Sequence, residues 1–189
     1  MECLLPASDF IEYEVQRFAH VLRLYKCRLL CYNYHMDTAR KPITVRRFRQ
    51  ADAGMLSTII IRCLREINSK DYPAPLIEKM CDHFTPDTIR LLAEQREMYV
   101  AEFNGEIVGT VSRDENKVFT MFVNPDYAGS GVGSRLMDYI ESLAAGEGFS
   151  FMETGASITA HDFYRKRGYV DVRESETEFG LNYILRRPL

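Results

Sequence analysis

The stretch that most constrains the fold of this chain lies within residues 118–146, where an apolar run, a glycine-rich turn and a helical repeat follow one another. The run from Val118 to Val123 has the composition of a strand, and Asn124-Pro125 ends it because proline cannot continue a hydrogen-bonded ladder. Apolar residues then recur every three or four positions, which predicts a helix that ends near Gly146. They are Val132, Leu136, Met137, Ile140 and Leu143.

A strand, a glycine loop and a helix in this order are suited to bind an anion. The first turn of a helix has unpaired amide N–H groups and a partial positive charge, and glycines let an oxygen approach the backbone closely. The loop is neither a Walker loop, because Gly133-Ser134-Arg135 lacks the lysine, nor a dinucleotide-binding turn, because its glycine spacing differs. On the loop alone, an ordinary strand-to-helix turn remains the alternative.

Two motifs in this region resemble the GNAT superfamily of N-acetyltransferases. Val123-Asn124-Pro125 and residues 128–133 resemble the family's Val-x-Pro and Arg/Gln-x-x-Gly-x-Gly/Ala, with Ala128 where the family usually has arginine or glutamine. Residues 160–169 resemble its A-x-x-F-Y-x-x-x-G-F/Y motif. The resemblance covers roughly residues 42–187.

The resemblance implies an α/β (α+β) fold with a mixed, mostly antiparallel sheet of six to seven strands flanked by helices. It also implies acetyl transfer from acetyl-CoA to a primary amine by direct attack in a ternary complex. CoA would insert where two strands splay apart beyond a bulge, and main-chain groups of Met121 and Val123 would hold its pantetheine. Ser157 stands where many members have an asparagine beside the CoA chain. Ala128 would modulate the affinity for the cofactor, and the pyrophosphate would lie on the amides of Gly129, Ser130, Gly131, Val132, Gly133 and Ser134.

The reaction needs two proton transfers of different difficulty, one to the leaving sulfur and one from the attacking amine. Tyr164 matches the family tyrosine that protonates the leaving sulfur; alternatively it is a core aromatic, as we expect Phe163 to be. A lysine-like amine is neutral in only roughly 1 in 2,500 molecules at neutral pH, so its deprotonation is the larger barrier. Glu153, Glu102 and His161 are the candidate bases, although each also fits a surface or structural role. An acceptor of low pKa needs no dedicated base.

Composition excludes several other classes of function. The net charge of −3 lacks the excess of positive charge that nucleic-acid binding requires. Five cysteines without C-x-x-C spacing indicate reduced thiols and a cytoplasmic protein. The four histidines show no metal-ligand spacing with them, so we expect no metal. No apolar run has the length of a membrane span.

We predict two parts, an N-terminal helical extension (residues 1–41) and the acetyltransferase domain (residues 42–189). The extension contains an amphipathic repeat that packs on its own domain or, alternatively, makes a homodimer contact; a chain that starts at Met36 is a third interpretation. The repeat is Ile11, Val15, Phe18, Leu22, Tyr25 and Leu29.

The remaining pattern predicts the other elements of the domain. Asn104-Gly105 indicates a type I′ hairpin, and the charged run 173–178 a solvated loop. Met55, Ile59, Cys63 and Ile67 would form the apolar face of the first helix. Strands are predicted over 43–49, 98–103, 107–112, 118–123, 149–154, 170–172 and 179–185, and helices over 51–67, 76–84, 86–94, 132–146 and 160–167.

Three functions stay open from the sequence. The first is acetylation of a small-molecule amine, and the second is a catalytically silent CoA-binding sensor or partner module. The third is a protein or peptide N-acetyltransferase, which would need a groove between residues 68–86 and the last hairpin. The sequence does not identify the acceptor, because members of a fold family differ in their sites.

Overall fold

The computed structural model describes residues 42–189, so the predicted N-terminal helix and its contacts lie outside the described residues. The strands of the described part are β1 (Thr44–Arg47), β2 (Glu97–Phe103), β3 (Glu106–Asp114), β4 (Lys117–Val123), β5 (Phe151–Ser157), β6 (Val170–Thr177) and β7 (Gly180–Pro188). Its α-helices are α2 (Ala53–Glu66), α3 (Ala74–His83), α4 (Pro86–Gln95), α5 (Val132–Gly146) and α6 (His161–Lys166).

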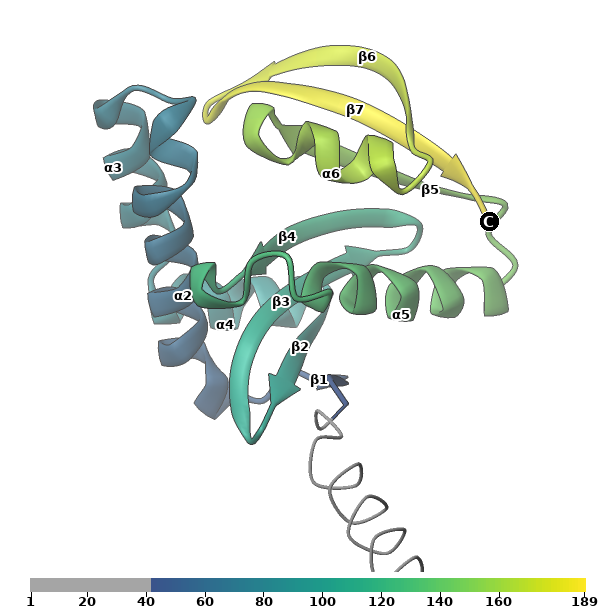
Figure 1. Cartoon of the computed structure of the whole chain (residues 1–189), viewed down its shortest axis with the longest axis horizontal. Helices are drawn as coiled ribbons and strands as arrows, with labels where there is room; N and C mark the ends of the chain where they lie inside the picture. The colour runs from purple at the N-terminus through teal and green to yellow at the C-terminus, as the bar shows by residue number, and fades with distance from the viewer. Residues whose placement is uncertain (1–41) are drawn as a thin grey trace, which may run out of the picture. The chain divides into compact units, whose positions relative to one another are not determined.

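The strands form one seven-stranded sheet in the order β1-β2-β3-β4-β5-β7-β6 (Figure 1). Every neighbouring pair is antiparallel except β4 and β5, which are parallel. The predicted mixed, mostly antiparallel sheet is confirmed. A parallel pair needs a crossover connection, and here α5 supplies it.

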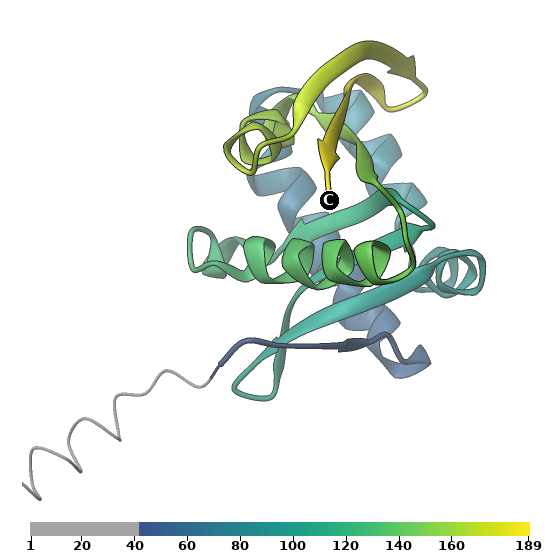
Figure 2. The same cartoon turned by 90° about the vertical axis from the view of Figure 1, so that its right-hand side faces the viewer.

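Helices cover both faces of the sheet and bury two separate cores. Helix α5 runs across the sheet (Figure 2) and buries Leu136, Met137 and Ile140 in one core, which also includes residues of α6. On the other face, α2, α3 and α4 form the second core with β2. A site that opens between strands can therefore be reached by residues from both helical layers.

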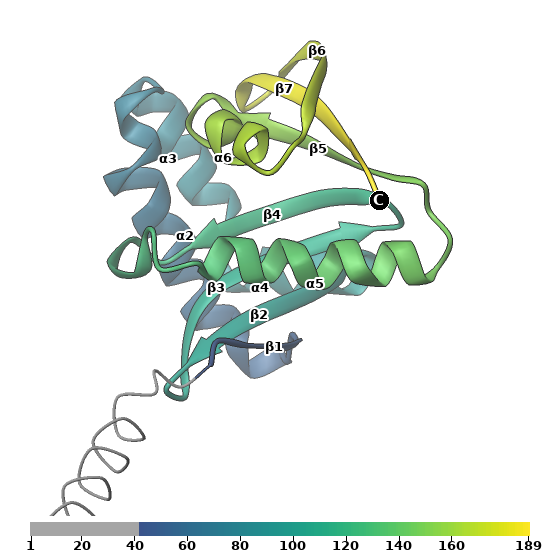
Figure 3. The same ribbon diagram turned by 45° about the vertical axis from the view of Figure 1, so that its right-hand side comes forward.

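Strands β4 and β5 are paired only over two residues, at the beginning of β4 and in the middle of β5. The parallel register covers Lys117 with Glu153 and Val118 with Thr154 and then stops. Figure 3 shows the two strands diverging toward their carboxyl ends. The predicted gap in the sheet is therefore present.

A bulge in β4 accompanies this divergence. Ser112 pairs with Phe119 and Thr110 pairs with Phe122, so β4 contains one residue more than β3 over this interval. Within it, Thr120 has a φ of 45°, which a β-branched residue rarely adopts. The bulge bends β4 where the gap begins.

Short sequence motifs predicted several of the turns and helix ends at their observed places. Asn104 and Gly105 have φ values of 54° and 84°, as the predicted type I′ turn requires. Gly168 follows α6 with a φ of 86°, the expected left-handed cap. Helix α5 ends at Gly146 as predicted, but the left-handed glycine beyond it is Gly148, with a φ of 89°.

Two predictions about individual elements are corrected by the structure. The charged run 173–178 is not a loop, because β6 continues to Thr177 as an edge strand paired with β7. Charged side chains suit such an edge because they discourage pairing with other chains. The predicted apolar face of α2 is buried at Ile59 and Cys63, but Met55 is 53% exposed. The buried face also includes Leu56, Ile60 and Leu64.

Candidate active site

A cavity of about 630 Å³ lies where β4 and β5 separate. Its walls come from α2, α3, β4, the loop before α5, the end of β5, α6 and the start of β7. The lining includes most of the residues that we predicted to hold the cofactor. They are Met121, Val123, Ala128, Gly129, Gly131, Val132, Gly133, Ser134 and Ser157.

The glycine loop presents bare backbone amides at one end of this cavity. Gly129 and Gly131 have φ values of 74° and 89°, which favour glycine, and α5 begins directly afterwards at Val132. Within residues 42–189, no backbone or side-chain acceptor pairs with the amides from Gly131 to Ser134. These four N–H groups and the positive end of the helix form an arrangement that binds phosphate.

Ser130 is the predicted loop residue that does not line the cavity. Its hydroxyl donates to the carbonyl of Tyr127 at 2.6 Å, and its amide bonds the same carbonyl at 3.2 Å. Ser130 therefore shapes the turn.

The edge of β4 supplies main-chain groups to the gap. Because Asn124 N–H donates to β3 at Val108, the alternation of a strand directs the N–H and C=O of Val123 away from β3. The Val123 carbonyl accepts from Cys63 Sγ at 3.0 Å. The same alternation directs the main chain of Met121 to the gap, so both residues turn main-chain groups away from β3.

Tyr164 reaches the cavity from α6. Its side chain is 3% exposed and packs edge-on against Tyr169 at 5.4 Å between ring centroids. Burial raises the pKa of Tyr164 to about 12, and the neighbouring Thr154 side chain only partly opposes this. Tyr164 is therefore a protonated hydrogen-bond donor throughout the neutral range. Phe163, expected in the core, also lines the cavity.

The structure places none of the three candidate bases in the cavity wall formed by residues 42–189. Glu153 accepts from Arg186 Nε at 2.7 Å, and Glu102 accepts from Arg46 Nε at 2.8 Å. His161 lies 2.5 Å from Asp171, between Nε2 and Oδ1. Each group is engaged in an ion pair or hydrogen bond outside the cavity.

One wall of the cavity was not predicted residue by residue, although parts of it belong to the segment 68–86 and the last hairpin, between which a peptide acceptor would need a groove. Its residues come from α2, from the segment between α2 and α4, and from β7. Their apolar side chains carry the same periodic signal as core residues, so the sequence offers no means to separate them. They are Cys63, Leu64, Ile67, Asn68, Met80, Phe84, Phe179 and Asn182.

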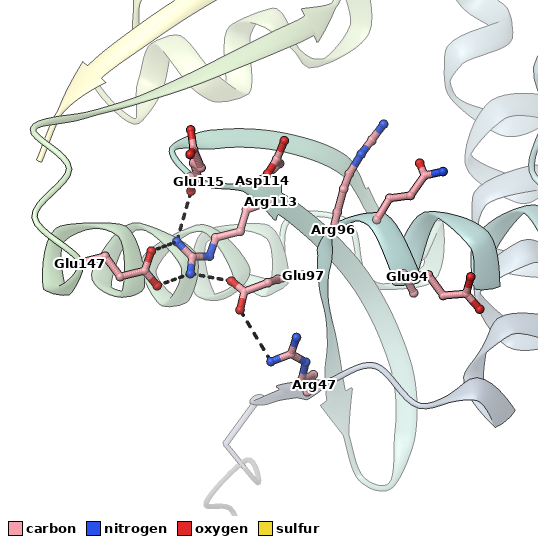
Figure 4. A pocket seen from close by; sticks show the side chains of 10 residues that line it. Arg47, Glu94, Arg96, Glu97, Arg113, Asp114, Glu115 and Glu147 are labelled. Carbon is pink, nitrogen blue, oxygen red and sulfur yellow. Dashed lines mark hydrogen bonds and ion pairs between the residues drawn. The ribbon is translucent and has the colours of Figure 1, made fainter.

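A second hollow of about 390 Å³ lies at the other end of β2 and β3, and it is lined by charged side chains (Figure 4). Arg113, 3% exposed, donates to Glu147 at 2.8 Å and contacts Glu97 at 2.5 Å. Glu97 also lies 3.6 Å from Arg47. Because these charges pair with one another, the hollow has the character of a structural ion-pair network.

No group of three or more metal-ligating side chains occurs in residues 42–189. No helix of this part has both the length and the apolar character needed to cross a membrane.

Comparisons with known proteins agree with this architecture. A sequence model of the acetyltransferase (GNAT) domain matches residues 69–184, more than half of the chain. The chain is 29% identical over 136 residues to the uncharacterized N-acetyltransferase YafP of Escherichia coli (strain K12), covering 72% of this chain and 87% of YafP.

Solved structures show the same fold. A GCN5-related N-acetyltransferase from Rhodopseudomonas palustris has a TM-score of 0.74 at 23% identity, covering 80% of this chain and 99% of that one. The PaiA N-acetyltransferase of Thermoplasma acidophilum, solved in complex with coenzyme A, has a TM-score of 0.65 at 15% identity, covering 78% of this chain and 99% of that one. With its open sheet and its family match, the chain belongs to the GNAT family of N-acetyltransferases.

Proposed function

We propose that this protein transfers the acetyl group of acetyl-CoA to a primary amine by direct attack within a ternary complex. The observation that carries the proposal is one continuous cavity that joins the bare amides of the α5 N-terminus, the free edge of β4 and the hydroxyl-bearing ring of Tyr164. The structural relative from T. acidophilum was solved with coenzyme A, which supports CoA as the donor carrier here.

In this proposal the donor lies along the gap between β4 and β5. The amides of Gly129 and Gly131 to Ser134 hold the pyrophosphate, and Met121 and Val123 bind the pantetheine through their main chains. Ser157 lines the opposite wall, where its hydroxyl accepts from the amide of Ala160 at 3.2 Å. Because the backbone makes most of these contacts, we expect the side chain of Ala128 to modulate affinity without deciding it.

The chemical step requires the amine nitrogen to attack the thioester carbonyl carbon, after which the C–S bond breaks. Tyr164 donates a hydrogen bond to the departing sulfur. A thiolate of pKa ~8.5 is a weaker base than the phenolate of Tyr164, so the hydrogen bond is favoured over complete proton transfer. The attacking nitrogen loses one proton to water. This proton compensates the negative charge of the departing thiolate. Glu153 has no role in this scheme, because its carboxylate is paired with Arg186.

The test is release of free CoA from acetyl-CoA, measured against a panel of primary amines. Gly131→Asp is the loop-blocked variant, because it puts a side chain at a φ of 89° and a negative charge at the predicted phosphate site. We expect amine-dependent release in the wild type and its loss in the variant. Unchanged release in the variant would contradict the placement of the pyrophosphate, and binding without release would favour a CoA-binding sensor.

A further inference from the structure

The cavity has an uncharged lining. None of the residues of the described part, 42–189, that line it is an aspartate, glutamate, lysine, arginine or histidine. Its titratable groups are Cys63, Tyr127 and Tyr164, and burial raises the pKa of each thiol or phenol, to about 12 for both Cys63 and Tyr164. All three are therefore neutral near physiological pH.

One wall of the cavity, formed by the end of α3, by β4 and by the turn before β7, is aromatic. Phe84 and Phe122 meet edge to face with their centroids 5.6 Å apart, and both line the cavity. Phe179 and Met80 complete this apolar surface, and the amides of Asn68 and Asn182 are polar groups beside it. Edge-to-face and offset contacts with such a surface suit a planar aromatic ring.

Three carboxylates of the segments beside this wall have partners of their own. Asp71 lies at the rim, where its Oδ2 accepts from the Thr159 hydroxyl at 2.7 Å. Glu66 accepts from Arg62 Nε at 2.9 Å, and Glu178 pairs with Lys79 at 3.1 Å. None of these carboxylates lines the cavity in the described part of the chain.

An uncharged cavity discriminates strongly among amines. A cationic amine would lose its hydration without gaining a counter-charge, which is unfavourable. It would also have to lose a proton in water before entering, and only roughly 1 in 2,500 molecules of a lysine-like amine is neutral near pH 7. An arylamine avoids both costs because its nitrogen is neutral and its ring is apolar.

Resting on the proposed acetyl transfer, we propose that the acceptor is a weakly basic amine on a planar aromatic body, bound uncharged against Phe84, Phe122 and Phe179. This class explains why the cavity needs no base: the nitrogen attacks as the neutral amine, and its proton leaves only after the N–C bond forms. Polyamines and aminoglycosides, which carry several positive charges, are disfavoured as acceptors.

Three probe amines test the inference in the CoA-release assay. They are 4-methylaniline, benzylamine and spermidine, of which the first two have the same atoms but differ in basicity. Near neutral pH we expect kcat/KM for 4-methylaniline to exceed the values for benzylamine and spermidine by about 10-fold or more. With rising pH, kcat/KM for benzylamine should increase about tenfold per unit, whereas that for 4-methylaniline should stay flat.

Asn182→Asp places a carboxylate in the cavity wall with almost no change of shape. We expect it to raise the ratio of kcat/KM for benzylamine to that for 4-methylaniline by about 10-fold, the effect of a nearby opposite charge. Asn104→Asp is the matched control, because it makes the same change in the β2–β3 turn, outside the cavity, and should leave the ratio unchanged. Asp71→Asn should leave turnover of 4-methylaniline unchanged; loss of that turnover would show that the rim carboxylate acts as a base and would overturn the inference.

The outcomes separate this inference from the proposed function. A higher kcat/KM for spermidine or benzylamine than for 4-methylaniline would overturn the inference and leave amine acetylation intact. Binding of acetyl-CoA without release by any of the amines would overturn both.

Discussion

At the scale of single residues, Thr120 and Tyr164 mark the gap between β4 and β5. Thr120 has a φ of 45° in the β4 bulge, and backbone strain of this kind costs on the order of 1–3 kcal/mol and tends to occur at functional sites. Tyr164 is a buried phenol that lines the cavity. Both residues line the gap between β4 and β5, which supports the assignment of this gap as the active site.

Replacing Tyr164 by phenylalanine removes the hydroxyl and keeps the ring. Loss of one hydrogen-bond donor to a developing charge typically lowers kcat about 10²-fold or more. We therefore expect Tyr164→Phe to lose about that much kcat while it binds acetyl-CoA as the wild type does. Titration calorimetry and the CoA-release assay together measure both quantities, and wild-type kcat in the variant would exclude Tyr164 from the reaction.

The pKa of Tyr164 makes a separate prediction about pH. Burial raises this pKa to about 12, so the hydroxyl keeps its proton, and its ability to donate, at every pH below that value. We expect the pH profile of kcat to show no falling limb due to Tyr164 between about pH 7 and about pH 10. A falling limb near pH 8–9 that disappears in Tyr164→Phe would contradict the buried position.

At the scale of elements, local chemistry decided which predictions succeeded. The Asn104-Gly105 turn and α5 follow from the backbone freedom of glycine and from an apolar repeat, and both were predicted at their observed places. Strand β6 was predicted to end at Val172 because charged residues follow, but an edge strand needs only backbone pairing, which β7 provides. The exposed Met55 shows the corresponding limit for helices. An apolar repeat predicts that one face of a helix is buried, but it does not fix which residues at the edge of that face are covered.

Close packing of α5 on β3 makes a testable prediction at this scale. A Cβ at Gly109 would lie 2.9 Å from the backbone oxygen of Phe122 and 3.0 Å from Val132 Cγ1. We expect Gly109→Ala to lower the free energy of unfolding by about 1–3 kcal/mol, the usual cost of overpacking. Urea denaturation measures it.

Gly54→Ala is the matched control for this change, because a Cβ there meets nothing within 4 Å and Gly54 lies in helix α2. It should leave the free energy of unfolding unchanged or raise it by up to about 1 kcal/mol. Equal stability of both variants would mean that α5 does not press on β3 as described.

At the scale of the whole domain, the site depends on one seven-stranded sheet in which β4 and β5 separate after a short paired stretch. The proposed donor side of the cavity could be predicted from the sequence, because one contiguous segment, residues 119–134, supplies most of it. The proposed acceptor side could not, because Phe84 and Phe179 come from distant segments that only the fold brings beside Phe122. The positions of the candidate bases outside the cavity wall could not be predicted for the same reason, since their partners Arg46, Arg186 and Asp171 are fixed by tertiary structure.

The most direct test of this account is a titration of the ¹⁵N-labelled protein with acetyl-CoA, followed through backbone amide resonances. We predict large shifts for Gly129, Gly131 and Gly133 and none for Gly105 in the distant hairpin turn. Saturable binding that leaves the three loop glycines unshifted would contradict the placement of the donor at the start of α5.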